Sequence, residues 1–168
     1  MLELGAGPGL TGFHVAHWAK EVIVSDYQEL VMDLLHKNIN ECNPRPQECK
    51  MFRCLLDWGD QNNMQAEIKD SSDQSVAKLC EYQVDVVIGT DIVYWPQSIK
   101  PLMATLNSIF AVSKNGLEFY MCYIERHTST KKILLAELEA NKFRVEEIGQ
   151  EISKPINLDS FIYKITKV

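Results

Sequence analysis

Four glycines near the start of the chain constrain it more than any other feature. They follow a short apolar run and an acidic residue, in the order Leu2-Glu-Leu-Gly-Ala-Gly-Pro-Gly-Leu-Thr-Gly12. Glycine allows positive φ angles and leaves free the space of a Cβ, so a strand can turn sharply into a helix while its backbone approaches a ligand. The pattern therefore predicts a ligand-binding strand–loop–helix unit.

The spacing of the glycines separates two classes of cofactor site. A dinucleotide-binding turn reads Gly-x-Gly-x-x-Gly and holds phosphate at the helix N-terminus. Counted from Gly5 and Gly7, that turn requires a glycine at position 10, which is Leu10. The actual spacing, Glu3-x-Gly5-x-Gly7-x-Gly9, resembles the first motif of the class I S-adenosylmethionine (SAM) methyltransferases. An NAD-linked oxidoreductase is therefore disfavoured.

Apolar runs alternate with helical patterns along the rest of the chain, which indicates an α/β fold. Strands are predicted at 1–4, 22–24, 51–56, 84–88, 117–124, 143–148 and 161–168. Helices are predicted at 10–20, where Phe13, Ala16 and Trp18 are packing candidates, and around 30–39, 99–110 and 133–138. Residues 60–82 are polar and predict an exposed insertion around a short helix. We expect a doubly wound, Rossmann-like, mostly parallel seven-stranded sheet with an antiparallel last strand.

Length and composition bound the organisation of the chain. At 168 residues with 46% hydrophobic content, residues 1–168 can form one domain with one core. The glycine motif follows a strand of about four residues, whereas such a strand is usually central. We therefore expect the first strand and the segment before it to be N-terminally incomplete.

The charge and the cysteine usage limit the kinds of partner and the cellular location that we expect for this chain. The formal net charge of −6 disfavours a nucleic-acid partner and is compatible with a basic protein partner. The five cysteines lack a C-x-x-C spacing, which favours reduced thiols and a cytoplasmic location, with the nucleus as an alternative. No apolar stretch approaches the roughly 18 residues that span a bilayer, so no membrane partner is expected. His14 and His17 lack a third ligand for a metal site.

Each part of SAM finds a candidate partner in the sequence. The glycine loop suits the methionine part, and Asp26, at the end of the second predicted strand, can accept hydrogen bonds from both ribose hydroxyls. Trp58 follows the third strand and can offer a face to adenine. The alternatives are structural: Asp26 would cap the next helix, and Trp58 would belong to the core or its rim.

Four segments together resemble the seven-β-strand protein-lysine methyltransferases of the family numbered sixteen. They are Leu2–Gly12, Val24-Ser-Asp26, Leu56-Asp-Trp-Gly59 and Gly89-Thr-Asp-Ile-Val-Tyr94, all within the first 100 residues. The resemblance implies SAM as cofactor, and cofactor-site residues at Glu3, Gly5, Ala6, Gly7, Gly9, Asp26, Trp58 and Thr90. It also implies that Asp91 and Tyr94 lie beside the target amine as the ends of an Asp-x-x-Tyr motif. A protein substrate with a reactive lysine is the implied partner.

The implied reaction is an in-line methyl transfer to a lysine ε-amine, in which the protein mainly aligns donor and acceptor. Asp91 would position the amine and accept its proton, and Tyr94 would shape the channel and stabilise a partly charged amine. The structural alternatives are a helix cap for Asp91 and a packed aromatic ring for Tyr94. Arg126 and His127, at the end of the fifth strand, are expected at the edge of the site, where the main expectation is a surface role and the alternative is a substrate contact.

Other functions stay open at this point. Members of the resembled family carry further sequence before the glycine motif, including a tryptophan that helps to close the cofactor pocket. A non-catalytic or incomplete methyltransferase-like binding module is therefore the main alternative. A nucleic-acid methyltransferase typically shows Asn/Asp-Pro-Pro-Tyr, and the segment from Asp91 to Tyr94 lacks these prolines. A small-molecule methyltransferase is a further alternative, and a monomer is expected.

Overall fold

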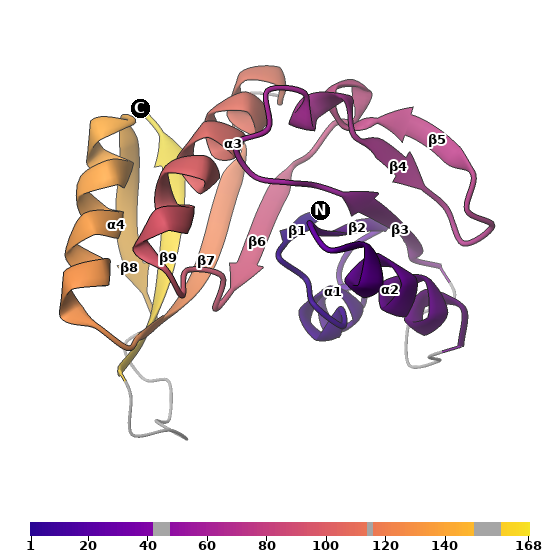
Figure 1. Cartoon of the computed structure of the whole chain (residues 1–168), viewed down its shortest axis with the longest axis horizontal. Coiled ribbons are helices and arrows are strands. Elements are labelled where there is room, and N and C mark those ends of the chain that lie inside the picture. The colour runs from indigo at the N-terminus through magenta and orange to yellow at the C-terminus, as the bar shows by residue number, and fades with distance from the viewer. Residues whose placement is uncertain (42–47, 114–115, 150–158) are drawn as a thin grey trace.

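A single nine-stranded sheet organises the molecule, with the strand order β5-β4-β3-β2-β1-β6-β7-β9-β8 (Figure 1). The computed structural model describes residues 1–41, 48–113, 116–149 and 159–168. The strands are β1 (Leu2–Leu4), β2 (Glu21–Asp26), β3 (Lys50–Leu55), β4 (Glu67–Lys69), β5 (Ser75–Lys78), β6 (Val86–Thr90), β7 (Glu118–Glu125), β8 (Phe143–Ile148) and β9 (Asp159–Lys167). The α-helices are α1 (Leu10–Val15), α2 (Glu29–Glu41), α3 (Ile99–Val112) and α4 (Thr128–Ala140). The short 3₁₀ helices are η1 (Asn63–Gln65), η2 (Leu79–Glu81) and η3 (Pro96–Ser98).

The short strand β1 occupies the centre of the sheet. It pairs in parallel with β2 on one side and β6 on the other, and β3 and β7 continue the parallel pairing outward. The carboxyl ends of these five strands therefore lie at one edge, and the strand order reverses between β1 and β6. In open α/β sheets ligands bind in the crevice at such a reversal.

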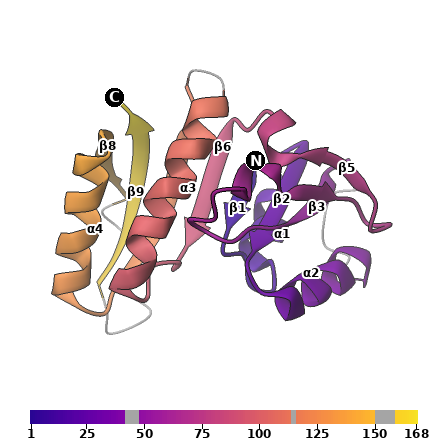
Figure 2. The same ribbon diagram turned by 45° about the horizontal axis from the view of Figure 1, so that its top comes forward.

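Helices cover both faces of the sheet, as the predicted doubly wound fold requires. Side chains alternate between faces along a strand, and β2 shows the result: Ile23 packs with residues of α3 and α4, whereas Val22 and Val24 pack with residues of α1 and α2. All three side chains are fully buried. Figure 2 shows α3 and α4 beside each other, apart from α1 and α2.

The last strand is antiparallel to both of its neighbours, β7 and β8, which confirms the prediction for that strand. The predicted number of seven strands is wrong, because the described residues form nine. The two additional strands, β4 and β5, form an antiparallel hairpin on β3 at the edge of the sheet. Only Ile68 of this hairpin is fully buried. Because its other positions do not face the core, its sequence lacks the alternation of apolar and polar residues by which a strand is predicted.

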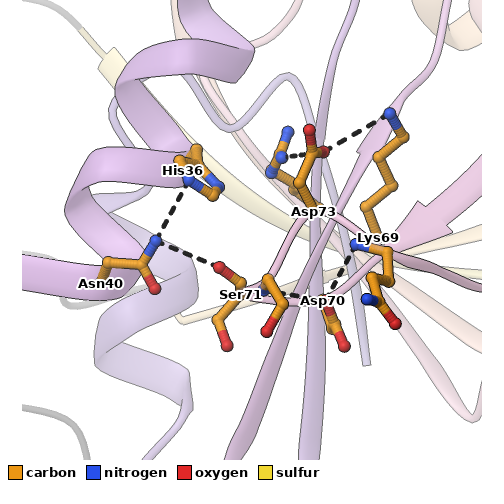
Figure 3. Close-up of polar contacts among 9 residues, drawn as sticks. His36, Asn40, Lys69, Asp70, Ser71 and Asp73 are labelled. Atoms are coloured by element: carbon orange, nitrogen blue, oxygen red, sulfur yellow. Dashed lines mark hydrogen bonds and ion pairs between the residues drawn. The ribbon is translucent and has the colours of Figure 1, made fainter.

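Polar contacts fix the hairpin that the sequence indicated as an exposed insertion (Figure 3). The Asp70 carboxylate accepts hydrogen bonds from the backbone N–H groups of Ser72, at 2.8 Å, and Gln74, at 3.1 Å, and so closes the turn. Asp73 forms ion pairs with Arg53 of β3 and, at 3.4 Å, with Lys69. These contacts replace the apolar packing that a central strand would have.

The first helix is shorter than predicted, and one of its packing candidates is wrong. The helix α1 ends at Val15, after which the N–H groups of His17 and Trp18 bond to carbonyl groups three residues earlier, at 3.3 and 2.9 Å. This tighter turn rotates Trp18 away from the core, and its side chain is 74% exposed. Phe13 and Ala16 are buried as predicted.

Two kinds of feature are absent from the part of the chain that the structure describes. None of its helices combines the length and the apolar character needed to cross a bilayer. It also contains no group of three or more His, Cys, Asp or Glu side chains placed to hold a metal ion.

Candidate active site

A cavity of about 510 Å³ opens at the carboxyl ends of the central strands. Its wall comes from the glycine loop, from the segments that follow β2, β3 and β6, and from the start of α3. The lining residues are Gly5, Gly7, Asp26, Tyr27, Gln28, Val31, Leu56, Asp57, Trp58, Ile92, Tyr94, Trp95, Ser98 and Pro101. The cavity therefore lies where the strand order reverses.

The glycine loop brings backbone directly to the cavity wall. Gly5 adopts a φ of +60°, and a Cβ at this position would lie 2.9 Å from Cγ2 of Ile92 and 3.5 Å from the ring of Trp58. The N–H of Ala6 bonds to the carbonyl of Ser25 at 2.8 Å, which ties the loop to β2. The absence of a side chain at Gly5 thus lets three segments converge on one wall.

Asp26 closes β2 and faces the same wall. Its carboxylate accepts hydrogen bonds from the backbone N–H groups of Gly7 at 3.0 Å, Tyr27 at 2.8 Å and Gln28 at 3.3 Å. The residue as a whole is buried, with 9% of its surface exposed. Asp26 therefore fixes the glycine loop and the turn into α2, and its carboxylate still contributes to the cavity wall.

Trp58 forms the wall after β3. The N–H of Leu56 bonds to the carbonyl of Asp26 at 2.8 Å, which continues the strand pairing up to the cavity. The N–H of Gly59 donates to Oγ1 of the buried Thr105 on α3 at 3.1 Å. The segment that carries the Trp58 ring is thereby anchored on both sides.

Asp91 and Tyr94 follow β6 in a strained and tightly held turn. Asp91 has a φ of +54°, unusual for a residue with a side chain, and its N–H bonds to the carbonyl of Cys122 on β7 at 2.8 Å. The two oxygens of its carboxylate accept from Nη1 and Nη2 of Arg126 at 2.5 and 2.6 Å. The centre of the Arg126 guanidinium lies 5.2 Å from the centre of the Tyr94 ring.

The titration behaviour of this group follows from the same contacts. Partial burial, and then the negative charge of Asp91, raise the pKa of Tyr94, so its phenol stays protonated at neutral pH. The hydrogen bonds to Asp91 raise the pKa of Arg126 above its usual value. The surface role predicted for Arg126 is therefore incomplete: its side chain is exposed, and it also contacts both ends of the Asp-x-x-Tyr motif.

The predicted site residues divide into two sets. The structure places Gly5, Gly7, Asp26, Trp58 and Tyr94 on the cavity wall. Glu3, Ala6, Gly9, Thr90 and Asp91 do not line it.

The predicted site residues that do not line the cavity lie in the segments next to its wall. Glu3 is 1% exposed and Gly9 begins α1 with a φ of 90°. Burial raises the pKa of Glu3 to about 7. The hydroxyl of Thr90 lies 3.0 Å from that of Thr11, which joins the end of β6 to the first turn of α1.

Several lining residues have no motif that would have revealed them. Tyr27 and Gln28 follow Asp26 directly, and Trp95 follows Tyr94. Their position immediately after a strand end was the available signal, because such segments gather at one edge of a parallel sheet. Arg126 also follows a strand end directly. Its contact with Asp91 could not be expected from this position alone, because it depends on β7 pairing with β6.

Comparisons with known proteins identify the family of this chain. The profile of a lysine methyltransferase family matches residues 1–140. The chain is 27% identical over 159 residues to the mouse protein-lysine N-methyltransferase EEF2KMT, covering 92% of this chain and 45% of that protein. It is 23% identical over 166 residues to the mouse protein N-lysine methyltransferase METTL21A, covering 99% of this chain and 65% of that protein.

The fold has relatives among solved structures. Magnesium protoporphyrin IX methyltransferase from Synechocystis, solved with bound SAM, superposes with a TM-score of 0.55 at 12% identity, covering 99% of this chain and 69% of that chain. This likeness shows the fold alone. The chain spans about half the length of the first curated relatives that it matches. The family match covers most of the described sheet, and this chain belongs to the lysine methyltransferase family.

Proposed function

We propose that this chain is a SAM-dependent methyltransferase that modifies the ε-amine of a lysine in a protein substrate. The observation that carries the proposal is one cavity that joins the glycine loop, Asp26 and Trp58 to Tyr94. The first three suit a nucleoside-containing cofactor, and Tyr94, with Asp91 behind it, suits a cationic acceptor side chain. Membership of the lysine methyltransferase family supports both halves.

The residues of the cavity fit SAM by their chemistry. A Cβ at Gly5 would collide with Ile92, so the wall is shaped for backbone, and Asp26 places a carboxylate where ribose hydroxyls can donate to it. The half-buried Trp58 offers an aromatic surface to adenine, and such stacking on a purine is worth about 1–3 kcal/mol. SAM, when bound, supplies a methyl group activated by a sulfonium.

The acceptor side of the cavity orients the amine and favours its free-base form. A free lysine has a pKa of about 10.4, so it must lose a proton before it can attack. The Asp91 carboxylate, held by Arg126, orients the amine, and the Tyr94 ring stabilises the charge that develops on the amine. Desolvation in the cavity lowers the pKa of the incoming lysine and so assists this step.

The proposal is tested first by binding and then by transfer. Calorimetric titration of the purified 168-residue chain with SAM and with its demethylated product, S-adenosylhomocysteine, should show binding of both. Methyl-labelled SAM should then label proteins of an extract at lysine, identified by peptide mass spectrometry. Absence of binding by the folded chain would overturn the proposal, and binding without any transfer would favour the alternative of a non-catalytic binding module.

The same proposal includes a monomer acting in the cytoplasm on a protein partner. The cysteine usage, without a C-x-x-C spacing, supports the location. Size-exclusion chromatography with light scattering and localisation of the tagged protein in cells would test them directly.

A further inference from the structure

The Arg126 side chain reaches the candidate acceptor site from a different strand than the residues it contacts. It follows β7, whereas Asp91 and Tyr94 follow β6. Its guanidinium binds both oxygens of Asp91, and this fork-to-fork geometry is the strongest arrangement of an ion pair. The same group lies over the Tyr94 ring. One side chain therefore fixes both ends of the Asp-x-x-Tyr motif.

The backbone of Asp91 explains why such a fixing contact is needed. A φ of +54° is strained for a residue with a Cβ relative to ordinary backbone conformations. The turn persists because the surrounding contacts hold it: the N–H bond to Cys122 on one side and the Arg126 pair on the other. Both contacts come from β7.

The ion pair also settles the charge of the acceptor site. Burial raises the pKa values of Tyr94, Cys122 and Tyr123, so these neighbours stay neutral at neutral pH. Within the ion pair the charges of Asp91 and Arg126 cancel, and the carboxylates of Asp26 and Glu125 act on Tyr94 and Tyr123 as further negative charges. An unpaired carboxylate here would raise the pKa of an incoming amine and hold the amine in its protonated, unreactive form. A carboxylate whose charge is offset by Arg126 raises that pKa less.

We infer that Arg126 is the positioning and charge-compensating residue of the acceptor site. It holds the Asp91 carboxylate and the Tyr94 ring in place, and it offsets the carboxylate so that a lysine amine enters as the free base. This inference rests on the proposed function, which puts a sulfonium and an amine in the same cavity. It adds the residue that balances the site's charge, which the Asp-x-x-Tyr motif by itself does not contain.

Cofactor binding tests the charge balance without a known protein substrate. SAM carries a positive sulfonium, and S-adenosylhomocysteine is its neutral counterpart, so the ratio of their dissociation constants reports the charge near the transferred methyl group. We would measure this ratio by calorimetry at low ionic strength, where charge interactions are least screened. The proteins are the wild type, Arg126→Gln, Asp91→Asn, the double variant and Arg126→Lys.

The expected pattern has opposite signs in the two single variants. Arg126→Gln leaves Asp91 unbalanced and should shift the ratio about three- to tenfold in favour of SAM. Asp91→Asn leaves Arg126 unbalanced and should shift it in favour of S-adenosylhomocysteine by a similar factor. The double variant and Arg126→Lys should stay within about twofold of the wild type, because the charge balance is restored.

The outcomes separate this inference from the proposed function. Binding of both cofactors with one unchanged ratio in all five proteins would overturn the inference and leave the proposed function standing. Failure of the folded wild type to bind either cofactor would overturn the proposed function. If Arg126 has only a structural role, Arg126→Gln should weaken the binding of SAM and of S-adenosylhomocysteine by the same factor. If Arg126→Gln does not fold, Asp91→Asn and the double variant still decide the question.

Discussion

The two sides of the cavity are built in different ways. The cofactor side, formed by the glycine loop, Asp26 and Trp58, is held mainly by backbone groups: the Asp26 carboxylate accepts from three main-chain N–H groups. On the acceptor side Tyr94 lines the cavity, and the ion pair between Asp91 and Arg126 beside it joins the ends of two strands. The three N–H donors survive any substitution except proline, so their bonds depend on Asp26 alone, whereas substitution of either partner removes the ion pair.

This difference predicts where the molecule is fragile. Substitutions on the acceptor side should remove catalysis and leave the fold and the neutral cofactor's affinity intact. Substitutions on the cofactor side should act on binding or on stability, because the loop there is part of the central packing: a Cβ on Gly5 or Gly12 would meet neighbouring side chains at under 3.0 Å.

The largest effect is expected at Asp91. Asp91→Ala should reduce methyl transfer by about 10³-fold, because the amine loses the group that orients it toward the methyl donor. The affinity for S-adenosylhomocysteine should change by less than about threefold, since that ligand carries no charge at the methyl position. Transfer rates and calorimetry on the same preparations measure both.

Asp85→Asn is the matched control for Asp91, because this exposed residue precedes the opposite end of β6. It should transfer methyl groups at the wild-type rate. Wild-type transfer by Asp91→Ala would remove Asp91 from the acceptor side.

The second effect is a dependence of stability on pH that originates at Glu3. Burial raises its pKa from 4.5 to about 7, so between these pH values the folded protein holds a proton that the unfolded chain has lost. Stability should therefore be highest below pH 4.5 as far as this group is concerned. It should fall by about 3 kcal/mol as the pH rises to 7.

Urea unfolding at several pH values measures this contribution. Glu3→Gln removes the titrating group and should flatten that part of the profile. An equal slope in the variant and the wild type would show that another group causes the pH dependence.

A third substitution tests the ribose contact. Asp26→Ala should weaken the binding of both SAM and S-adenosylhomocysteine by about 10- to 100-fold, because each charged hydrogen bond contributes about 1.5–3 kcal/mol. Glu139→Ala, which removes one negative charge from the exposed face of α4, should bind as the wild type does. If both variants weaken binding equally in calorimetry, Asp26 acts only through the net charge of the protein and not through a contact with the ribose.

The smallest effects compare two glycines of the same loop. A Cβ at Gly12 would lie 2.5 Å from Oε2 of Glu3 and 2.5 Å from Cγ1 of Val24, so Gly12→Ala should destabilise the fold by about 1–3 kcal/mol through overpacking. At Gly7 nothing lies within 4 Å, and the cost is the φ of +53°, about 1–2 kcal/mol.

Urea unfolding and calorimetry distinguish the two glycine variants. Gly12→Ala should lose stability with little direct effect on the cavity. Gly7→Ala should also weaken cofactor binding, because Gly7 lines the cavity and its N–H bonds to Asp26. Identical binding and stability changes in both variants would contradict the distinction between packing and lining glycines.

Much of the fold could be predicted because its signals are local. The strands at β2, β6 and β7 and the helix α3 coincide with apolar runs and helical periodicity in the sequence. The hairpin of β4 and β5 could not be predicted, because its stability comes from an edge pairing and from ion pairs such as Asp73 with Arg53. The prediction that Trp18 packs in the core is wrong, because a tighter turn after Val15 directs its side chain outward. The spacing of apolar residues does not indicate such a turn.

The sequence by itself determined the doubly wound fold and the cofactor side of the cavity. Spacing within one loop, and an acidic or aromatic residue directly after a strand, are local features, and parallel pairing brings strand ends together. Only the tertiary structure decided the acceptor side. Arg126 lies 35 residues after Asp91, and the two meet because β7 pairs with β6 in a register that no local pattern encodes. The charge of that site is therefore a property of the sheet.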